Sequence, residues 1–419
     1  MNNICLYFQI HHPFSFQTFR YFDTGINKTY YDHLRNEKEI REFTKKCIFP
    51  GNNFLLNLIK QTKGELKITF YISGTALDLF LMYAPEVLNS IRKLSDYGNI
   101  EFAGGTSSHS IVSLSDQKEE FKKQINRYYE RIEYLFDQKP QLFINSDLLY
   151  SDEISGIVAE TGYPAMLTNG TQKILQWRSP NYMYSNSHAK GIRLFLRNEE
   201  ISTSLSAILA DKDFSLKSGY TNEYYKLIKT LPPEEPVTNI YFDYNSLSGP
   251  KTKEKFSFFK KLVFNILDNH NQRFSLPSEI IGQFGPVGNL SATDPVCWKE
   301  HFHPDYYPGN EMQKDAISQL FNLAKKVNSS PDYNIKTDWQ YLQSTDHFHQ
   351  MDDNYPFYQP GQFSTGNIKS KYDAYINYMN ILDDFRRRLR IEPKSKKTNQ
   401  VNMTQKVPAN SNIKEQKGK

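Results

Sequence analysis

Short apolar runs that end in polar residues recur along the first two thirds of the chain. They have the length of strands, and stretches with apolar positions three or four residues apart lie between them. The predicted strands are Ile4–Ile10, Leu66–Ser73, Ile100–Ala103, Gln141–Ile144 and Val237–Phe242. The predicted helices between them include Leu77–Tyr97 and Gln117–Phe136. Alternation of strands and helices predicts an α/β fold with a parallel sheet, either open or closed into a barrel.

The chain becomes helical from about residue 310 onward. Its periodicity there predicts helices within Glu311–Val327, Asp338–Met351 and Tyr372–Ile391. The last of these ends before Pro393, where a low-complexity segment begins. At 419 residues, the chain is long enough for one barrel domain with additional helices.

Aromatic residues are abundant, with 28 Tyr and 29 Phe. Their faces are suited to stacking against sugar rings, although packing in the core is the more common role of such residues. Trp177, Trp298 and Trp339 are candidates for sugar contacts, and Trp339 also fits a packing role within its helix.

The three cysteines, Cys5, Cys47 and Cys297, are far apart and lack CxxC spacing. This pattern argues against a disulfide framework or a zinc knuckle and is typical of a reducing compartment. The N-terminal apolar run has no basic region before it and no small-residue cleavage site after it. No apolar run reaches the roughly 18 residues of a membrane span, so we expect a cytoplasmic protein without a membrane partner.

The net charge of +5 is concentrated at the C-terminus. Residues 391–419 hold seven Lys and two Glu, a local excess of 7 − 2 = +5, so the remainder is close to neutral. We therefore expect a solvated basic tail and no nucleic-acid partner.

Two carboxylates directly follow predicted strands. Asp147 lies in FINSDLLYSDEI and Asp243 in NIYFDYNSLSG. In barrels of this kind, chemistry gathers at the C-terminal ends of strands, and a carboxylate pair across a cleft is what glycoside hydrolysis requires. Each Asp alone also fits a simple capping role at a turn or helix.

Histidines also lie near the predicted strand ends. His11 and His12 follow the first strand, His109 follows the third, and His347 and His349 lie in the helical part. A His and Asp cluster at strand ends is compatible with a metal-dependent hydrolase, but HExxH and HxxxH spacings are absent. We expect neither a metal nor another cofactor.

Six segments together resemble the α-amylases of glycoside hydrolase family 57. In order along the chain they are ICLYFQIHHPFSFQTFRYFDTG, FYISGTALDLFLMYAPEVL, IEFAGGTSSHS, FINSDLLYSDEI, NIYFDYNSLSG and DWQYLQSTDHFHQM. The resemblance runs from about residue 4 to residue 390. It implies an incomplete (β/α)7 barrel followed by helices, and retaining chemistry on α-1,4-glucans.

The resemblance also assigns roles to residues. Asp243 stands at the acid/base position, and Asp147 stands at the nucleophile position, where the family has Glu. His11, Asp346 and His347 match positions that line the family's cleft. His12, His109 and Trp339 complete the residues that we expect to contact substrate.

Departures from the family pattern concentrate at the same site. Besides Asp147, an Arg of the third motif is replaced by Ile144, and a Glu and a Tyr of the second by Gly105 and Ser107. The fourth motif carries Asn245, Leu247, Ser248, Gly249 and Pro250 in place of Glu, Phe, Gly, Glu and His, and the fifth continues from His349 to Asn354 in place of Tyr-Tyr-Met-Cys-Thr-Lys. An Asp carboxylate sits back by about 1.5 Å relative to Glu, and a misplacement of about 1 Å costs about 10²-fold in rate.

The sequence therefore predicts an α-amylase-like protein that acts on or binds α-1,4-glucans or maltooligosaccharides, with a degenerate site and weakened or lost activity. One alternative is an active retaining α-glucan hydrolase or glucanotransferase, and another is a metal-dependent hydrolase on a related barrel. We expect the barrel over residues 1–290, a helical region that completes the cleft over 291–392, and a disordered basic tail over 393–419.

Overall fold

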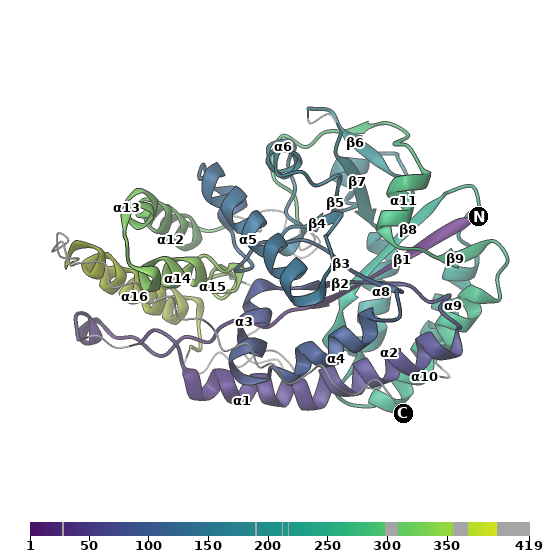
Figure 1. Cartoon of the computed structure of the whole chain (residues 1–419), viewed down its shortest axis with the longest axis horizontal. Coiled ribbons are helices and arrows are strands. Elements are labelled where there is room, and N and C mark those ends of the chain that lie inside the picture. Colours follow the sequence, from purple (N-terminus) through teal and green to yellow (C-terminus); the bar gives the residue numbers. More distant parts are fainter. Residues whose placement is uncertain are drawn as a thin grey trace, which may run out of the picture.

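A barrel of parallel strands forms the centre of the computed structural model, and helices surround it (Figure 1). The described residues are 1–26, 29–188, 191–211, 213–216, 218–297, 309–353, 355 and 368–391. The expected basic tail and Trp298 lie outside them.

Seven strands close the barrel. They are β1 (Asn2–Ile10), β2 (Ile68–Ile72), β3 (Ile100–Phe102), β4 (Leu142–Ile144), β5 (Ala165–Asn169), β7 (Arg193–Arg197) and β8 (Val237–Asp243). Each strand pairs in parallel with the next, β8 returns to β1, and the step from β3 to β4 is a parallel bridge between Gly104 and Phe143. The predicted (β/α)7 architecture is confirmed.

Three further strands extend the sheet outside this ring. β6 (Tyr184–Asn186) pairs antiparallel with β7, and β10 (Asn289–Leu290) pairs with β6. β9 (Gln272–Phe274) pairs with the first residues of β1, whereas β2 pairs with its last four.

Helices connect the barrel strands and cover their outer face (Figure 1). Those of the barrel are α1 (His33–Phe43), α2 (Phe49–Gln61), α3 (Gly74–Tyr83), α4 (Glu86–Ser95), α5 (Lys118–Phe136), α6 (Asp152–Glu160), α7 (Gln172–Leu175), α8 (Glu199–Ala210), α9 (Gly219–Lys229), α10 (Thr252–Leu267) and α11 (Pro277–Gln283). None of the helices in the described part of the chain is long and apolar enough to cross a membrane.

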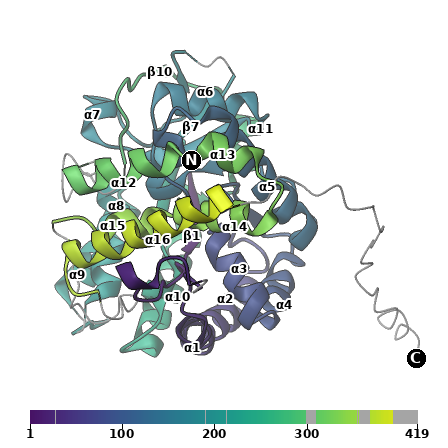
Figure 2. The ribbon, with the colours of Figure 1, turned by 90° about the vertical axis from the view of Figure 1, so that its left-hand side faces the viewer.

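A C-terminal helical region lies at one end of the barrel. It consists of α12 (Glu311–Phe321), α13 (Ala324–Ser329), α14 (Tyr333–Leu342), α15 (Thr345–His349) and α16 (Lys371–Ile391). Figure 2 shows α16 lying across this end, with β1 behind it. A bridge between Ser110 and Ser344 and an ion pair between His11 and Asp346 join the two parts, so the helices cover the end at which β1 finishes.

All five predicted strands are confirmed, within a few residues at their ends. β5 and β7 were not among the predictions, although each is a short apolar run. The predicted helix Leu77–Tyr97 is two helices, because Pro85 has no amide proton to donate and interrupts the ladder of hydrogen bonds. The predicted helix Asp338–Met351 is likewise divided, into α14 and α15, at Gln343 and Ser344.

The core surrounds β1, whose nine residues are all buried. Phe8 is its centre, with ring contacts to Phe70, Phe242, Tyr244 and Phe259 at centroid distances of 4.7 to 5.8 Å. Such tilted and edge-on pairs each add about 0.5–1.5 kcal/mol beyond the burial of apolar area. The central strand that carries His11 at its end is therefore held firmly.

Glu101 lies on β3, and desolvation there disfavours the ionised form of its carboxyl group. Burial raises the pKa of Glu101 to about 7, although Ser278 hydrogen-bonds to its carboxylate. An unfolded Glu loses its proton near pH 4.5, so the folded state retains this proton between about pH 4.5 and 7, and stability falls as the pH rises through that range.

We predict that Glu101→Gln is more stable than the wild type by about 1–3 kcal/mol at pH 8, with little difference at pH 4. Urea unfolding across this pH range measures the effect. Glu130→Gln, on the exposed face of α5, is the matched control and should leave the pH dependence unchanged. Equal pH dependence in Glu101→Gln and wild type would contradict the assignment.

Candidate active site

Polar side chains converge where the barrel strands end, below the helical region. His11 follows β1, Ser73 follows β2, Asp147 follows β4, Arg197 ends β7 and Asp243 ends β8. Because the strands are parallel, their C-terminal ends meet at one face of the barrel, which is where barrel enzymes place their catalytic groups.

His11 forms the contact that joins the barrel to the helical region. Its Nε2 lies 2.9 Å from Oδ1 of Asp346, and its Nδ1 lies 2.8 Å from Oγ of Ser73. Burial disfavours the charged imidazole, but the Asp346 carboxylate and its hydrogen bond outweigh this and raise the pKa of His11. Burial alone would raise the pKa of Asp346. The charge of His11 and its hydrogen bond outweigh this effect and hold the pKa of Asp346 well below its usual range. The two residues form a buried ion pair.

The neighbouring histidines are neutral. His109 stacks on His11 with ring centroids 4.2 Å apart, and burial, with the nearby charge of His11, lowers the pKa of His109 to about 3. Burial lowers the pKa of His12 and of His347 to about 4. Nδ1 of His109 lies 3.1 Å from the Tyr71 hydroxyl. One charged imidazole is thus surrounded by uncharged ones.

Asp147 lies on a tight turn that follows β4. Its backbone is left-handed (φ 52°), as is that of Leu148 (φ 53°), which costs energy in residues other than glycine. Asn145 braces the turn, because its Nδ2 donates to the carbonyl of Leu149 and its side-chain oxygen accepts from the amide of Ser146. Oδ2 of Asp147 lies 2.6 Å from Nε2 of His349, and both side chains are almost fully buried. The side chain and the backbone of Asp147 are both fixed.

Asp243 belongs to the same electrostatic environment as Asp147. Besides the dominant effects of burial and of Asp346, the charges of Asp147 and Asp243 both raise the pKa of His11. After burial and Tyr71, these two carboxylates also contribute to a pKa of Tyr241 well above its usual value. The two predicted carboxylates and His11 all lie at the C-terminal ends of barrel strands, at the same face of the barrel.

Arg197 is a cation of this site that sequence reasoning missed. It is buried at the end of β7, where it donates to Oδ1 of Asn169 and Oγ1 of Thr203. Burial lowers the pKa of Arg197 to about 10, while Glu199, Tyr241 and Asp243 oppose that shift. The sequence feature that could have identified Arg197 is its position directly after the apolar run Leu194–Leu196. It supplies positive charge near Asp243 although the Arg of the third motif is replaced by Ile144.

Gly105 cannot carry a side chain in this structure. A Cβ atom at this position would lie 2.5 Å from Cε2 of Tyr71, closer than real Cβ contacts. The Tyr71 ring thus occupies the space that a side chain at position 105 would need. The packing around Gly105 therefore requires glycine at this position.

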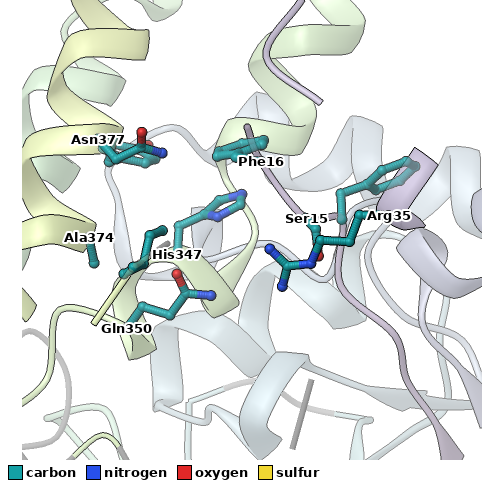
Figure 3. Close-up of a pocket in the computed structure, with 10 residues that line it drawn as sticks. Ser15, Phe16, Arg35, His347, Gln350, Ala374 and Asn377 are labelled. Carbon is teal, nitrogen blue, oxygen red and sulfur yellow. The ribbon is translucent and has the colours of Figure 1, made fainter. Parts of the chain in front are cut away.

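Two hollows adjoin these residues. A groove of about 1140 Å³ runs beside the segment that follows β8 and is lined by His12, Phe43, Cys47, Asn245 and Lys255, among others. A smaller pocket behind His347 is shown in Figure 3, where His347 lies next to Phe16. The centroids of these two rings are 4.1 Å apart, and Nε2 of His347 lies 3.0 Å from the carbonyl of Tyr341.

Trp339 lies away from the site. Only 1% of it is exposed, its ring packs against Phe321, and its Nε1 lies 3.4 Å from the carbonyl of Leu320. It therefore packs the helical region and cannot contact a sugar in this structure. Trp177, by contrast, is 85% exposed.

No group of three or more His, Cys, Asp and Glu in the described ranges is arranged to hold a metal ion. The described histidines near the strand ends are engaged in carboxylate, hydroxyl and carbonyl contacts, as His11 and His349 are with Asp346 and Asp147. The geometry gives the metal-dependent alternative no support among these residues.

A closed barrel with two carboxylates at the C-terminal ends of its strands is the arrangement of a glycoside hydrolase. The chain belongs to glycosyl hydrolase family 57, whose model matches residues 5–293. It is 27% identical over 387 residues to a Methanocaldococcus jannaschii protein described as "Putative alpha-amylase", covering 87% of this chain and 78% of that protein.

Solved structures share the fold. The branching enzyme of family 57 from Pyrococcus horikoshii superposes with a TM-score of 0.66 at 12% identity, covering 91% of this chain and 88% of that one. The 4-alpha-glucanotransferase of Thermococcus litoralis superposes with a TM-score of 0.63 at 14% identity, covering 83% of this chain. This chain spans 56% of the length of the glucanotransferase.

We predict that Asp346→Asn lowers the free energy of unfolding by about 3 kcal/mol at pH 5.5, because it leaves His11 as a buried charge without its partner. Asp346, with its lowered pKa, stabilises the fold above about pH 4 and ceases to do so as the pH falls further. His11, with its raised pKa, stabilises it below about pH 6.5 and ceases to do so as the pH rises through its folded-state value.

The loss in Asp346→Asn should therefore be greatest between about pH 4 and 6.5, as measured by urea unfolding at several pH values. Asp383→Asn removes a carboxylate from a more exposed ion pair on α16 and serves as the control. Its expected cost is about 0–1 kcal/mol. Equal losses in the two variants would show that the His11–Asp346 pair has no special role.

Proposed function

We propose that this protein binds α-1,4-glucans at the C-terminal face of its barrel and hydrolyses them slowly, with Asp243 as acid/base and Asp147 as the second carboxylate. The observation that carries the proposal is that Asp147 directly follows β4 and Asp243 ends β8, so both carboxylates lie at the C-terminal ends of barrel strands. Membership of family 57 supports α-glucans as the substrate class. The M. jannaschii relative, described as an alpha-amylase, supports the same class.

The low rate is proposed from the state of Asp147. Asp is shorter than the Glu expected at this position, and retaining chemistry needs carboxyl groups about 5–5.5 Å apart. The Asp147 carboxylate is also engaged by His349 at 2.6 Å on a turn with little freedom to move toward a substrate. These contacts hold the shorter side chain in place, so it cannot move forward to make up for the missing methylene group.

The groove next to β8 supports a binding role. It begins at Asn245, two residues after Asp243, and continues through Phe43 to α1 and through Cys47 to the segment between α1 and α2. Its lining is mixed, with Lys255 donating to the carbonyls of Ser246 and Ser248. We propose that a maltooligosaccharide lies along this groove with the glycosidic bond to be cleaved next to Asp243.

Long incubation of the protein with maltoheptaose should give shorter or longer oligosaccharides at a rate well below about 1 s⁻¹, the low end for ordinary enzymes. Asp243→Asn should give none, because an amide cannot protonate the leaving oxygen. Product chromatography with mass spectrometry makes the measurement. Turnover at about 1 s⁻¹ or more would favour the alternative of a fully active hydrolase or glucanotransferase.

Binding is tested separately from turnover. Calorimetric titration with maltoheptaose should give similar affinities for wild type and Asp243→Asn, because the substitution removes a proton donor and keeps the shape of the site. Failure of both proteins to bind maltoheptaose or longer glucans would refute the proposed function. Binding without products would identify a glucan-binding relative that has lost catalysis.

A further inference from the structure

We propose that His349 is a positioning residue of this site, which orients the Asp147 carboxylate and keeps it ionised. The proposal deepens the proposed function and rests on it for the role of Asp147 in turnover. His349 lies at the end of α15 in the helical region, whereas Asp147 follows β4 of the barrel. The contact therefore crosses between the two parts of the fold.

The geometry of the pair is that of a charge-assisted hydrogen bond. Nε2 of His349 lies 2.6 Å from Oδ2 of Asp147, at the short end of the range for such bonds. In the proposed pair the carboxylate is ionised and only accepts, so Nε2 of His349 is the donor in this hydrogen bond. The side chains are 7% and 6% exposed, so water competes little for the bond. A buried carboxylate without such a donor would be costly to keep charged.

The backbone around Asp147 sets the place from which its side chain extends toward His349. Two successive left-handed residues aim the turn away from the regular path of a strand end. Oγ1 of Thr168 lies 3.3 Å from the carbonyl of Leu148, and Asn145 holds both sides of the turn. These contacts fix where the Asp147 Cα lies, and the imidazole then selects the direction in which the carboxylate points.

His349 has a local counterpart in Asp346, one turn earlier on the same short helix. Asp346 binds His11 of β1, and Oγ of Ser344 donates to its other oxygen at 2.7 Å. A single helical turn thus presents one carboxylate to a barrel imidazole and one imidazole to a barrel carboxylate. The two contacts reinforce each other in setting the position of α15, and so in setting the direction of Asp147.

The role predicts different outcomes for two substitutions of similar size. His349→Gln keeps an N–H donor at about the reach of Nε2, whereas His349→Leu removes it. His349→Leu should lower kcat for maltoheptaose by about 10²-fold with KM changed less than about threefold, because a misplacement of about 1 Å has a cost of this order. His349→Gln should retain most of the wild-type kcat. His188→Gln, at an exposed histidine that pairs with Asp152, is the control.

A spectroscopic measurement tests the pair without relying on turnover. Proton NMR of the wild type should show a low-field imidazole N–H resonance that disappears in His349→Gln and shifts upfield in Asp147→Asn, while all variants keep the wild-type circular dichroism spectrum. A resonance unaffected by Asp147→Asn, or none in the wild type, would overturn the proposal. Equal kcat in His349→Leu and wild type would also overturn it. If the wild type has no turnover but the resonance behaves as expected, the proposed hydrolysis fails while the positioning contact stands.

Discussion

The ion pair between His11 and Asp346 is the constraint on which the rest of the site depends. It is largely buried, and each partner holds the other in its charged form. Breaking such a pair costs more than its formation contributes, because a buried charge is left alone. The pair therefore joins the residue that follows β1 to the helical region and sets where the two parts meet.

The site around the His11–Asp346 pair contains both charged and uncharged side chains. Burial lowers the pKa of His109 and of His12, so both are uncharged at neutral pH. Asp147 and Asp243 favour the charged form of His11, and Asp243 also favours that of Arg197. The described part of the site thus holds both acidic and basic groups at the C-terminal face of the barrel.

The local pattern predicted a parallel sheet, five of its strands and two carboxylates directly after strands, and the resemblance to family 57 predicted that the sheet closes into a barrel. Apolar runs identify strands, and polar residues directly after them identify the chemical face. It did not predict the pairing of His349 with Asp147 or the place of Arg197 near Asp243, since contacts between segments so far apart in the chain depend on how the parts fold together. Trp339 was wrongly predicted to contact substrate, whereas it is buried in the helical region. An aromatic residue beside a motif looks the same in the sequence whether it faces a ligand or the core.

The close approach of Tyr71 to Gly105 limits which sequences this fold can accept. With the ring in place, any side chain at position 105 would collide with it, so a larger residue fits there only if Tyr71 moves or is replaced at the same time. Two changes that must occur together are much rarer than two that can occur in turn. The identities of the residues at positions 71 and 105 are therefore coupled, although the two lie in different strand-end segments.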